Sequence, residues 1–242
     1  QRPQKKAIQQ DDAAVQRWLE TDYPAIAERA KKEKATIFWE DETAVQQDTN
    51  WIRGYAPRGK TPTILHDRRA CYGAPVMISA VNNQGLSAFA FQRSAVRRYS
   101  FIRFLHRLIK DYGGKGRKLF VICDNAEFTS KAGSCLGEAH TEEIELFFLP
   151  AYSPELNPDE FLNRQLKTSL RVKGPMNHEE TLGHAKEITA TFKSEKTPIR
   201  ACFTKESTLY AQAACPGAAY RTICQLNHCF VNSYALINEN QV

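Results

Sequence analysis

Two short apolar runs in the second half of the chain constrain its fold more than any other feature. The segments KLFVICD (118–124) and IELFFLP (144–150) are each bounded by turn residues and show no helical periodicity. Runs of this kind are typical of strands that are buried on both faces. A sheet with two buried faces needs helices on each side, which indicates an α/β architecture.

Three further strands are predicted upstream of these runs. ATIFWED (35–41) is rich in β-branched and aromatic residues, without a helical stripe. Segments 72–81 and 86–92 have the same character, and the residues between them, 82–85, are turn formers. The first part of the sheet is therefore expected to be three consecutive strands with hairpin-type connections.

Helices are predicted where apolar residues recur every three or four positions. Residues 95–112 give the clearest case, ended by Gly113. Residues 11–34 suit helical segments, which we expect to break near Pro24. Further helices are expected over 130–140, from about Asp159 to Val172, and over 178–193.

The order of these elements predicts a mixed five-stranded sheet flanked by helices. The first three strands would be antiparallel and the last two would belong to βαβ units. In such a sheet the first and fourth strands are neighbours. We expect a helical lead-in over 1–34, one sheet-containing domain over 35–213, and a tail of unknown role over 214–242.

Composition and net charge indicate which class of binding partner and which cellular compartment to expect. A net charge of +6 favours a polyanionic partner. No run of about 18 apolar residues is present, so no membrane span is expected. The seven cysteines include no C-x-x-C pair, and Cys224, His228 and Cys229 lack a fourth ligand at zinc spacing. With no secretory signal pattern, we expect a cytoplasmic protein with reduced thiols.

Three acidic residues stand at informative places in this predicted fold. Asp41 ends the first strand, Asp124 ends the fourth, and Glu160 lies in the first turn of the helix after the fifth. In open α/β sheets, functional groups gather at the carboxyl ends of strands. We therefore expect the three carboxylates to converge at one edge of the sheet.

Each acid also has a simpler interpretation when taken alone. Asp124 could open a turn or cap a helix, and Glu160 could only complement a helix dipole. Asp41 competes with Glu40 and Glu42 beside it. Strand alternation places Asp41 on the same face as Trp39 and opposite Glu40, which favours it without excluding its neighbours.

Taken together, the three acids predict a metal site. Ionised carboxylates within a few ångströms repel one another, so that a proton or a cation must lie between them. Oxygen ligands around an open site suit Mg²⁺ or Mn²⁺. Two such ions, about 3.5–4 Å apart, can drive cleavage of a phosphodiester.

Candidate DNA-binding cations lie in two places. On the last predicted sheet-covering helix, Arg164, Lys167 and Arg171 follow Glu160 along one face, at spacings of four, three and four. A solvated surface face is the alternative. The Gly/Pro-rich connection over 51–62 carries a second set, namely Arg53, Arg58 and Lys60.

Four stretches of the sequence resemble one known family. They are FWEDETAV (38–45), RGYAPRGKTP (53–62), VICDNAEF (121–128) and ELFFLPAYSPELNPDEFLNRQLK (145–167). Together they resemble the DDE transposases of the mariner superfamily, and most of all its bacterial insertion-sequence branch. The last stretch is the most specific, and it indicates Glu160 rather than Asp159 as the third acid.

The resemblance covers roughly residues 12–213 and implies a ribonuclease-H-like fold. It implies that Asp41, Asp124 and Glu160 bind two Mg²⁺ ions, with Mn²⁺ as a substitute. The implied activity is hydrolysis at transposon ends, followed by transfer of the 3′-hydroxyl into target DNA. A homodimer on DNA, associated with the bacterial nucleoid, is the implied active form.

Three departures from the family pattern keep alternatives open. Family members generally carry a helix-turn-helix region before the catalytic domain, which this sequence does not show, and many have His where Thr129 stands. Residues after 213 look unlike the family. The alternatives are a nuclease without strand transfer and a catalytically silent DNA-binding or dimerising remnant.

Overall fold

We describe the protein from a computed structural model. The structure describes residues 7–46, 57–60, 74–93, 95–114, 116–124, 140, 142–172 and 177–212. Apart from His140, the helix expected over 130–140 lies outside these residues, as do Arg53, Thr129 and the tail from 214 onwards. Within the described part of the chain, no helix is long and apolar enough to cross a membrane.

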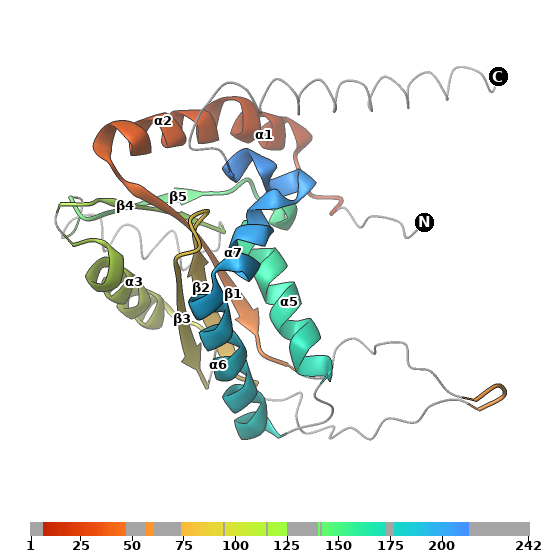
Figure 1. The fold of residues 1–242 in the computed structure, drawn as a ribbon. Coiled ribbons are helices and arrows are strands. Elements are labelled where there is room, and N and C mark those ends of the chain that lie inside the picture. Colours follow the sequence, from red (N-terminus) through yellow and green to blue (C-terminus); the bar gives the residue numbers. More distant parts are fainter. Residues whose placement is uncertain are drawn as a thin grey trace, which may run out of the picture.

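The sheet has five strands in the order β3-β2-β1-β4-β5 (Figure 1). β1 pairs antiparallel with β2, and β2 with β3, whereas β4 runs parallel to both β1 and β5. The predicted topology is confirmed, including the contact between the first and fourth strands. The strands are β1 (Thr36–Ala44), β2 (Val76–Val81), β3 (Ser87–Gln92), β4 (Leu119–Cys123) and β5 (Ile144–Phe148).

β1 is three residues longer than the sequence predicts. Glu42, Thr43 and Ala44 continue the ladder with β2, where they pair with Ile78, Met77 and Val76. The run of acids at 40–42 hides this extension, because charged residues are unusual in a strand. Asp41 therefore lies within a paired strand and is held by the ladder on its β2 side.

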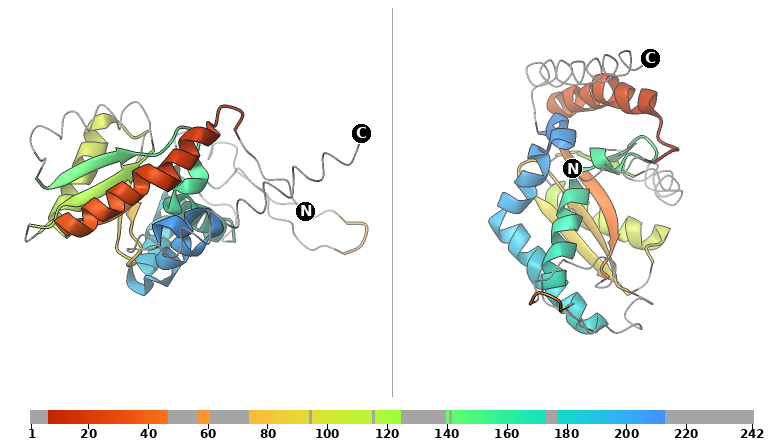
Figure 2. Two further views of the ribbon diagram at one scale, coloured as in Figure 1. Left: turned by 90° about the horizontal axis from the view of Figure 1, so that it is seen from above. Right: turned by 90° about the vertical axis from the view of Figure 1, so that its right-hand side faces the viewer.

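Helices cover both faces of the sheet (Figures 1 and 2). One face packs against α3, through an apolar cluster that includes Phe38, Phe101 and Leu105. The other packs against α2, α5 and α6, through a cluster that includes Trp39 and Leu166. These helices are α2 (Tyr23–Glu33), α3 (Arg98–Tyr112), α5 (Pro158–Val172) and α6 (His178–Glu195).

The expected break near Pro24 is wrong. α1 (Asp12–Arg17), a π-helical turn over Trp18–Asp22 (η1) and α2 follow one another without interruption. The N–H of Tyr23 donates to the carbonyl of Trp18, five residues back. Pro24 is the second residue of α2, so the π-helical turn comes directly before the proline that has no N–H to donate.

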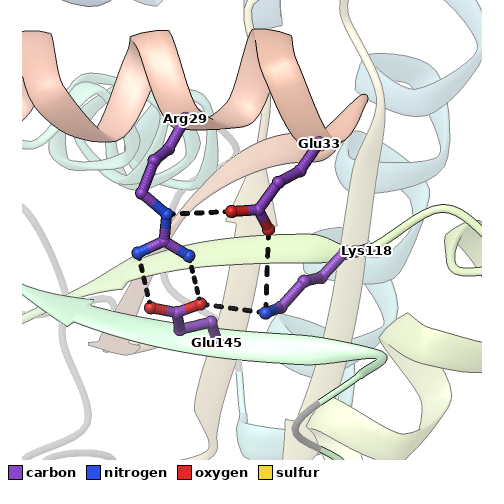
Figure 3. Close-up of polar contacts among 4 residues, drawn as sticks. All are labelled: Arg29, Glu33, Lys118 and Glu145. Atoms are coloured by element: carbon purple, nitrogen blue, oxygen red, sulfur yellow. Dashed lines mark hydrogen bonds and ion pairs between the residues drawn. The ribbon is translucent and has the colours of Figure 1, made fainter.

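α2 is tied to the sheet by a network of charged side chains (Figure 3). The Arg29 guanidinium donates to both carboxylate oxygens of Glu145 on β5, at 2.9 and 2.6 Å. Lys118 lies 3.0 Å from Glu145 and 3.8 Å from Glu33, which also accepts from Arg29. The network fixes α2 across β4 and β5, with Arg29 also lying over the ring of Phe120.

Segments from both ends of the described chain pack together on the face of β1 that carries Trp39. They are the amino-terminal helices and three short helices, α7 (Thr197–Ala201), η4 (Cys202–Thr204) and η5 (Glu206–Ala211). Trp39 on β1 meets Phe203 edge to face at 5.1 Å, and Tyr23 meets Tyr210 in the same way at 4.7 Å. The Tyr210 hydroxyl donates to the Leu156 carbonyl at 2.8 Å. This aromatic packing supports the strand that carries Asp41.

Candidate functional site

The parallel pairing of β1 with β4 brings Asp41 and Asp124 to the same edge of the sheet. Trp39 pairs with Ile122 in the ladder, and each acid lies two residues beyond its member of that pair. Asp124 is exposed and Asp41 is half-buried. Glu160, also half-buried, comes to this edge in the first turn of α5.

Two asparagines hold the start of α5 against the carboxyl end of β1. Asn157, just before the helix, donates from Nδ2 to the Glu40 carbonyl at 2.9 Å, and its Oδ1 accepts from the Asp159 N–H at 3.0 Å. One turn further on, Asn163 Nδ2 donates to Asp41 Oδ2 at 2.7 Å. The distance between Glu160 and the strand is thereby set by hydrogen bonds rather than by apolar packing alone.

Side-chain alternation along β1 follows the prediction. Trp39 packs in the cluster under α5, whereas Phe38 packs in the cluster under α3. Asp41 reaches α5 through Asn163, on the same face as Trp39. Glu40 is 1% exposed, so it is closed to a substrate, unlike Asp41.

The electrostatics of Asp41 show a site with unneutralised negative charge. Burial raises the pKa of Asp41 to about 7, with the nearby charges of Glu160 and Asp124 adding to the shift. Hydrogen bonds from the Glu42 backbone and from Asn163 oppose this rise in pKa. An aspartate with such a pKa holds a proton near neutrality unless a cation takes its place.

Glu160 and Glu42 show the same pattern. Burial raises the pKa of Glu160, and the charge of Asp124 adds to it, whereas Lys167 and Arg164 on the same helix lower it. Burial, followed by the charges of Asp41 and Asp124, raises the pKa of Glu42 to about 8. The three predicted acids are thus close enough to affect one another's ionisation.

Sequence reasoning missed two buried polar residues on α5. Asp159 and Asn163 are both fully buried. Burial, and then the charge of Asp41, raise the pKa of Asp159 well above its usual range. Helical spacing could have found both, since they lie seven and three residues before the buried Leu166.

The three predicted acids offer ligands that fit a hard divalent cation, but their side chains are not gathered around one point. Asp41, Asp124 and Glu160 offer only carboxylate oxygens, the ligands that Mg²⁺ and Mn²⁺ prefer. Among the described residues, no group of three or more His, Cys, Asp or Glu side chains is already placed to hold a metal ion. The oxygen ligands of the three acids and the repulsion among their charges fit a divalent cation. Their side chains would have to move to bind one together.

The predicted cations on α5 lie on the expected surface. Arg164 is exposed, and Lys167 and Arg171 are half-buried. The Arg164 guanidinium lies 5.1 Å from the centre of the Phe161 ring. The buried stripe of α5, on another face, consists of Leu162, Leu166 and Leu170.

The second predicted set of cations is described only in part. Arg58 and Lys60 are exposed in a turn that the Lys60 N–H closes onto the Pro57 carbonyl at 2.9 Å. Arg53 lies outside the described residues. Nothing in this turn connects Arg58 or Lys60 with the three acids.

Comparison with known proteins identifies the family. A family model described as DDE superfamily endonuclease matches residues 36–183, more than half of the chain. The chain belongs to the DDE superfamily endonucleases. The matched stretch contains Asp41, Asp124 and Glu160. Curated proteins gave no sequence match.

Solved structures of Mos1, a mariner transposase, share the fold of this DDE endonuclease. The Mos1 paired-end complex with Mn has a TM-score of 0.60 and 16% identity, over 88% of this chain and 67% of that one. The pre-cleavage Mos1 transpososome has a TM-score of 0.59 and 15% identity, over 88% of this chain and 67% of that one. The Mos1 strand transfer complex has a TM-score of 0.58 and 15% identity, over 88% of this chain and 66% of that one. Likeness at this identity supports the ribonuclease-H-like fold, and this chain spans about two thirds of Mos1.

Proposed function

We propose that this DDE endonuclease is the catalytic domain of a transposase, which hydrolyses DNA at transposon ends and joins the freed 3′-hydroxyl to target DNA. Asp41, Asp124 and Glu160 would hold the divalent cations. One observation carries the proposal: the parallel register places Asp41 and Asp124 level at one sheet edge, and hydrogen bonds hold the helix of Glu160 against it.

Two Mg²⁺ ions bound there, or Mn²⁺ in their place, would activate the attacking water or hydroxyl and stabilise the departing oxygen. The chain itself supplies the negative charge that attracts them. Asp41, with its pKa near 7, would exchange a proton for a cation on loading. Glu40 and Asp159 are buried, so they would not contact the substrate.

DNA is the proposed partner of the surface next to Glu160. Arg164, Lys167 and Arg171 continue from that residue along α5, where they would follow a phosphate backbone beyond the cleaved bond. Arg53, Arg58 and Lys60 are proposed as additional contacts. Mos1 has been seen in a paired-end complex with the left transposon end and in complexes with Mg and Mn, which supports both the DNA and the cation.

The wider biological setting is proposed on the resemblance in sequence. We place the catalytic domain at residues 35–213, after a helical lead-in over 1–34, and assign no role to 214–242. The active form would be a homodimer, and the protein would belong to the bacterial insertion-sequence branch and act at the nucleoid in the cytoplasm.

A second candidate function is a catalytically silent, DNA-binding or dimerising remnant. The observation that favours it is the absence of a ready-made metal-binding group among the residues described by the structure. In that case the acids would repel one another without ever gathering around a cation.

A plasmid assay separates these functions. Supercoiled plasmid with Mn²⁺ reports nicking, and a duplex with a free 3′-hydroxyl added to plasmid reports joining. We expect both, and we expect Asp124→Asn to lose more than about 100-fold in each, since groups that merely support metal ligands contribute about 10- to 100-fold. Asp111→Asn on α3 is the matched control, with unchanged rates.

The outcomes point to different functions. Nicking without joining would indicate a simple nuclease. DNA binding without either reaction would indicate the remnant. Full activity of Asp124→Asn would refute the assignment of that acid.

A further inference from the structure

Asn163 makes a single, short side-chain contact to the proposed site. It is fully buried on α5, and its Nδ2 donates to Asp41 Oδ2 at 2.7 Å. Its Oδ1 is buried too and, within the described part of the chain, makes no hydrogen bond. With Asp41 ionised, as it must be to bind a cation, the reverse orientation of the amide would set two acceptor oxygens against each other.

The fold gives no reason for an amide at this position. Asn163 lies on the buried side of α5, between Leu162 and Leu166, where a leucine would add to the apolar stripe. A buried polar atom left without a partner costs about 1–3 kcal/mol. The amide is therefore expected to lower stability, and what it provides in return is the hydrogen bond to Asp41.

The chemistry of that bond suits a residue that orients a metal ligand. A neutral amide holds one carboxylate oxygen without neutralising its charge, whereas Lys or Arg at this place would compete with a bound cation. Ser79, which pairs with Asp41 across the ladder, donates to the Asp41 backbone carbonyl at 3.4 Å and leaves the carboxylate untouched. Besides Asn163, the Glu42 N–H also donates to the Asp41 carboxylate, and neither donor neutralises its charge.

We propose that Asn163 is a positioning residue, which fixes the Asp41 carboxylate so that its second oxygen faces the divalent cation. The inference rests on the proposed function, because it needs Asp41 to be a ligand. It adds a residue outside the three acids. It also explains why α5 carries on its buried face an amide whose nitrogen is hydrogen-bonded and whose oxygen, among the described residues, is not.

The test compares Asn163→Leu with Gln165→Leu, which also replaces a side-chain amide by leucine, at an exposed position two residues away on the same helix. Free Mn²⁺ would be titrated by electron paramagnetic resonance, with no DNA present. We expect Asn163→Leu to bind Mn²⁺ about 10- to 100-fold more weakly, in line with the loss of other groups that orient metal ligands. In EDTA its melting temperature should be equal to or above that of the wild type.

A kinetic measurement adds a second readout. The Mn²⁺ concentration for half-maximal nicking should rise by the same factor in Asn163→Leu, whereas the rate at saturating Mn²⁺ should recover in large part. Asn163→Ala, which cannot clash with its surroundings, carries the same expectation for Mn²⁺ binding if the leucine variant does not fold. Gln165→Leu should match the wild type in both measurements.

Three results would overturn the inference, and they can be told apart. If the wild type and both Asn163 variants bind Mn²⁺ equally, Asn163 does not position Asp41, and the proposed function stands. If the wild type binds no Mn²⁺, the metal site itself is wrong and the inference falls with it. A melting temperature lowered in both variants, with Mn²⁺ affinity unchanged, would assign Asn163 a purely structural role.

Discussion

At the scale of single residues, the metal-free site should make stability depend on pH. The pKa of Asp41 is raised to about 7 and that of Glu42 to about 8, so the folded protein binds protons that the unfolded chain has already released. The folded state must give them up as pH rises, and its stability falls over that range. The sign is opposite to that of a carboxylate in an ion pair.

The prediction is that, in EDTA, the melting temperature falls between pH 5 and pH 8. Asp41→Asn should flatten this dependence, because it removes one of the groups that must ionise. Glu28→Gln, at an exposed position on α2, is the control and should keep the wild-type profile. A melting temperature that rises from pH 5 to pH 8, in differential scanning fluorimetry, would contradict the raised pKa values.

At the scale of the elements, α5 has one face for the core and another for the proposed DNA. Replacing Arg164, Lys167 and Arg171 together by Ala should weaken DNA binding and reduce the slope of log K against log salt by about 2–3, since each phosphate contact contributes about 0.9. Arg103, Arg107 and Lys110 form a matched set on α3, across the sheet. Their triple Ala variant should keep the slope, and equal effects of both sets in fluorescence anisotropy would argue against a DNA path along α5.

The charged network of α2 carries a second prediction at this scale. The Arg29 hydrogen bonds, and after them Lys118, lower the pKa of Glu145. The contribution of Glu145 to stability is therefore present above the pKa that it has in the unfolded chain. It is lost as pH falls through the lower pKa of the folded state. Because Arg29 is 43% exposed, we expect a coupling of only about 1 kcal/mol between the two residues.

A double-mutant cycle at pH 7 measures that coupling. Arg29→Met, Glu145→Gln and the double variant would be unfolded in urea, and the coupling should shrink in high salt and at pH 3. A coupling near zero at pH 7 would mean that apolar packing alone holds α2 on β4 and β5.

At the scale of the whole molecule, the core extends beyond the stretch that matches the family. Residues 36–183 hold all five strands, yet Trp39 packs against Phe203 and Tyr23 against Tyr210. Phe203→Ala should lower the free energy of unfolding by about 3–5 kcal/mol. Tyr210→Phe, which removes the hydroxyl that donates to the Leu156 carbonyl, should lower it by about 1 kcal/mol. A loss for Phe203→Ala no larger than about 1 kcal/mol, in urea unfolding, would mean that the carboxyl-terminal helices are not part of the core.

The sequence predicts the sheet well, because three consecutive strands followed by two buried runs and their helices indicate a meander and then βαβ units. It predicts less where local rules compete. Pro24 signals a helix break, and only the π-turn before it removes the conflict. The acids at 40–42 hide the end of β1, whereas alternation still separates Asp41 from Glu40.

The candidate site is predictable in its parts and not in its assembly. The spacing of apolar residues and acids places Asp41, Asp124 and Glu160 at one edge. It does not reveal that Asn163 holds Asp41, since helical spacing can predict that Asn163 is buried but not which side chain of another element it contacts. Nor does it show that, among the described residues, no three such side chains are already placed to hold a metal ion.

Anomalous diffraction from a crystal soaked in Mn²⁺, measured at the manganese edge, tests the proposed metal site without any assay. We expect at least one anomalous peak within coordination distance of carboxylate oxygens from Asp41, Asp124 and Glu160, after side-chain movement. A well-ordered crystal with no peak there, or with manganese bound only elsewhere, would contradict the proposed site.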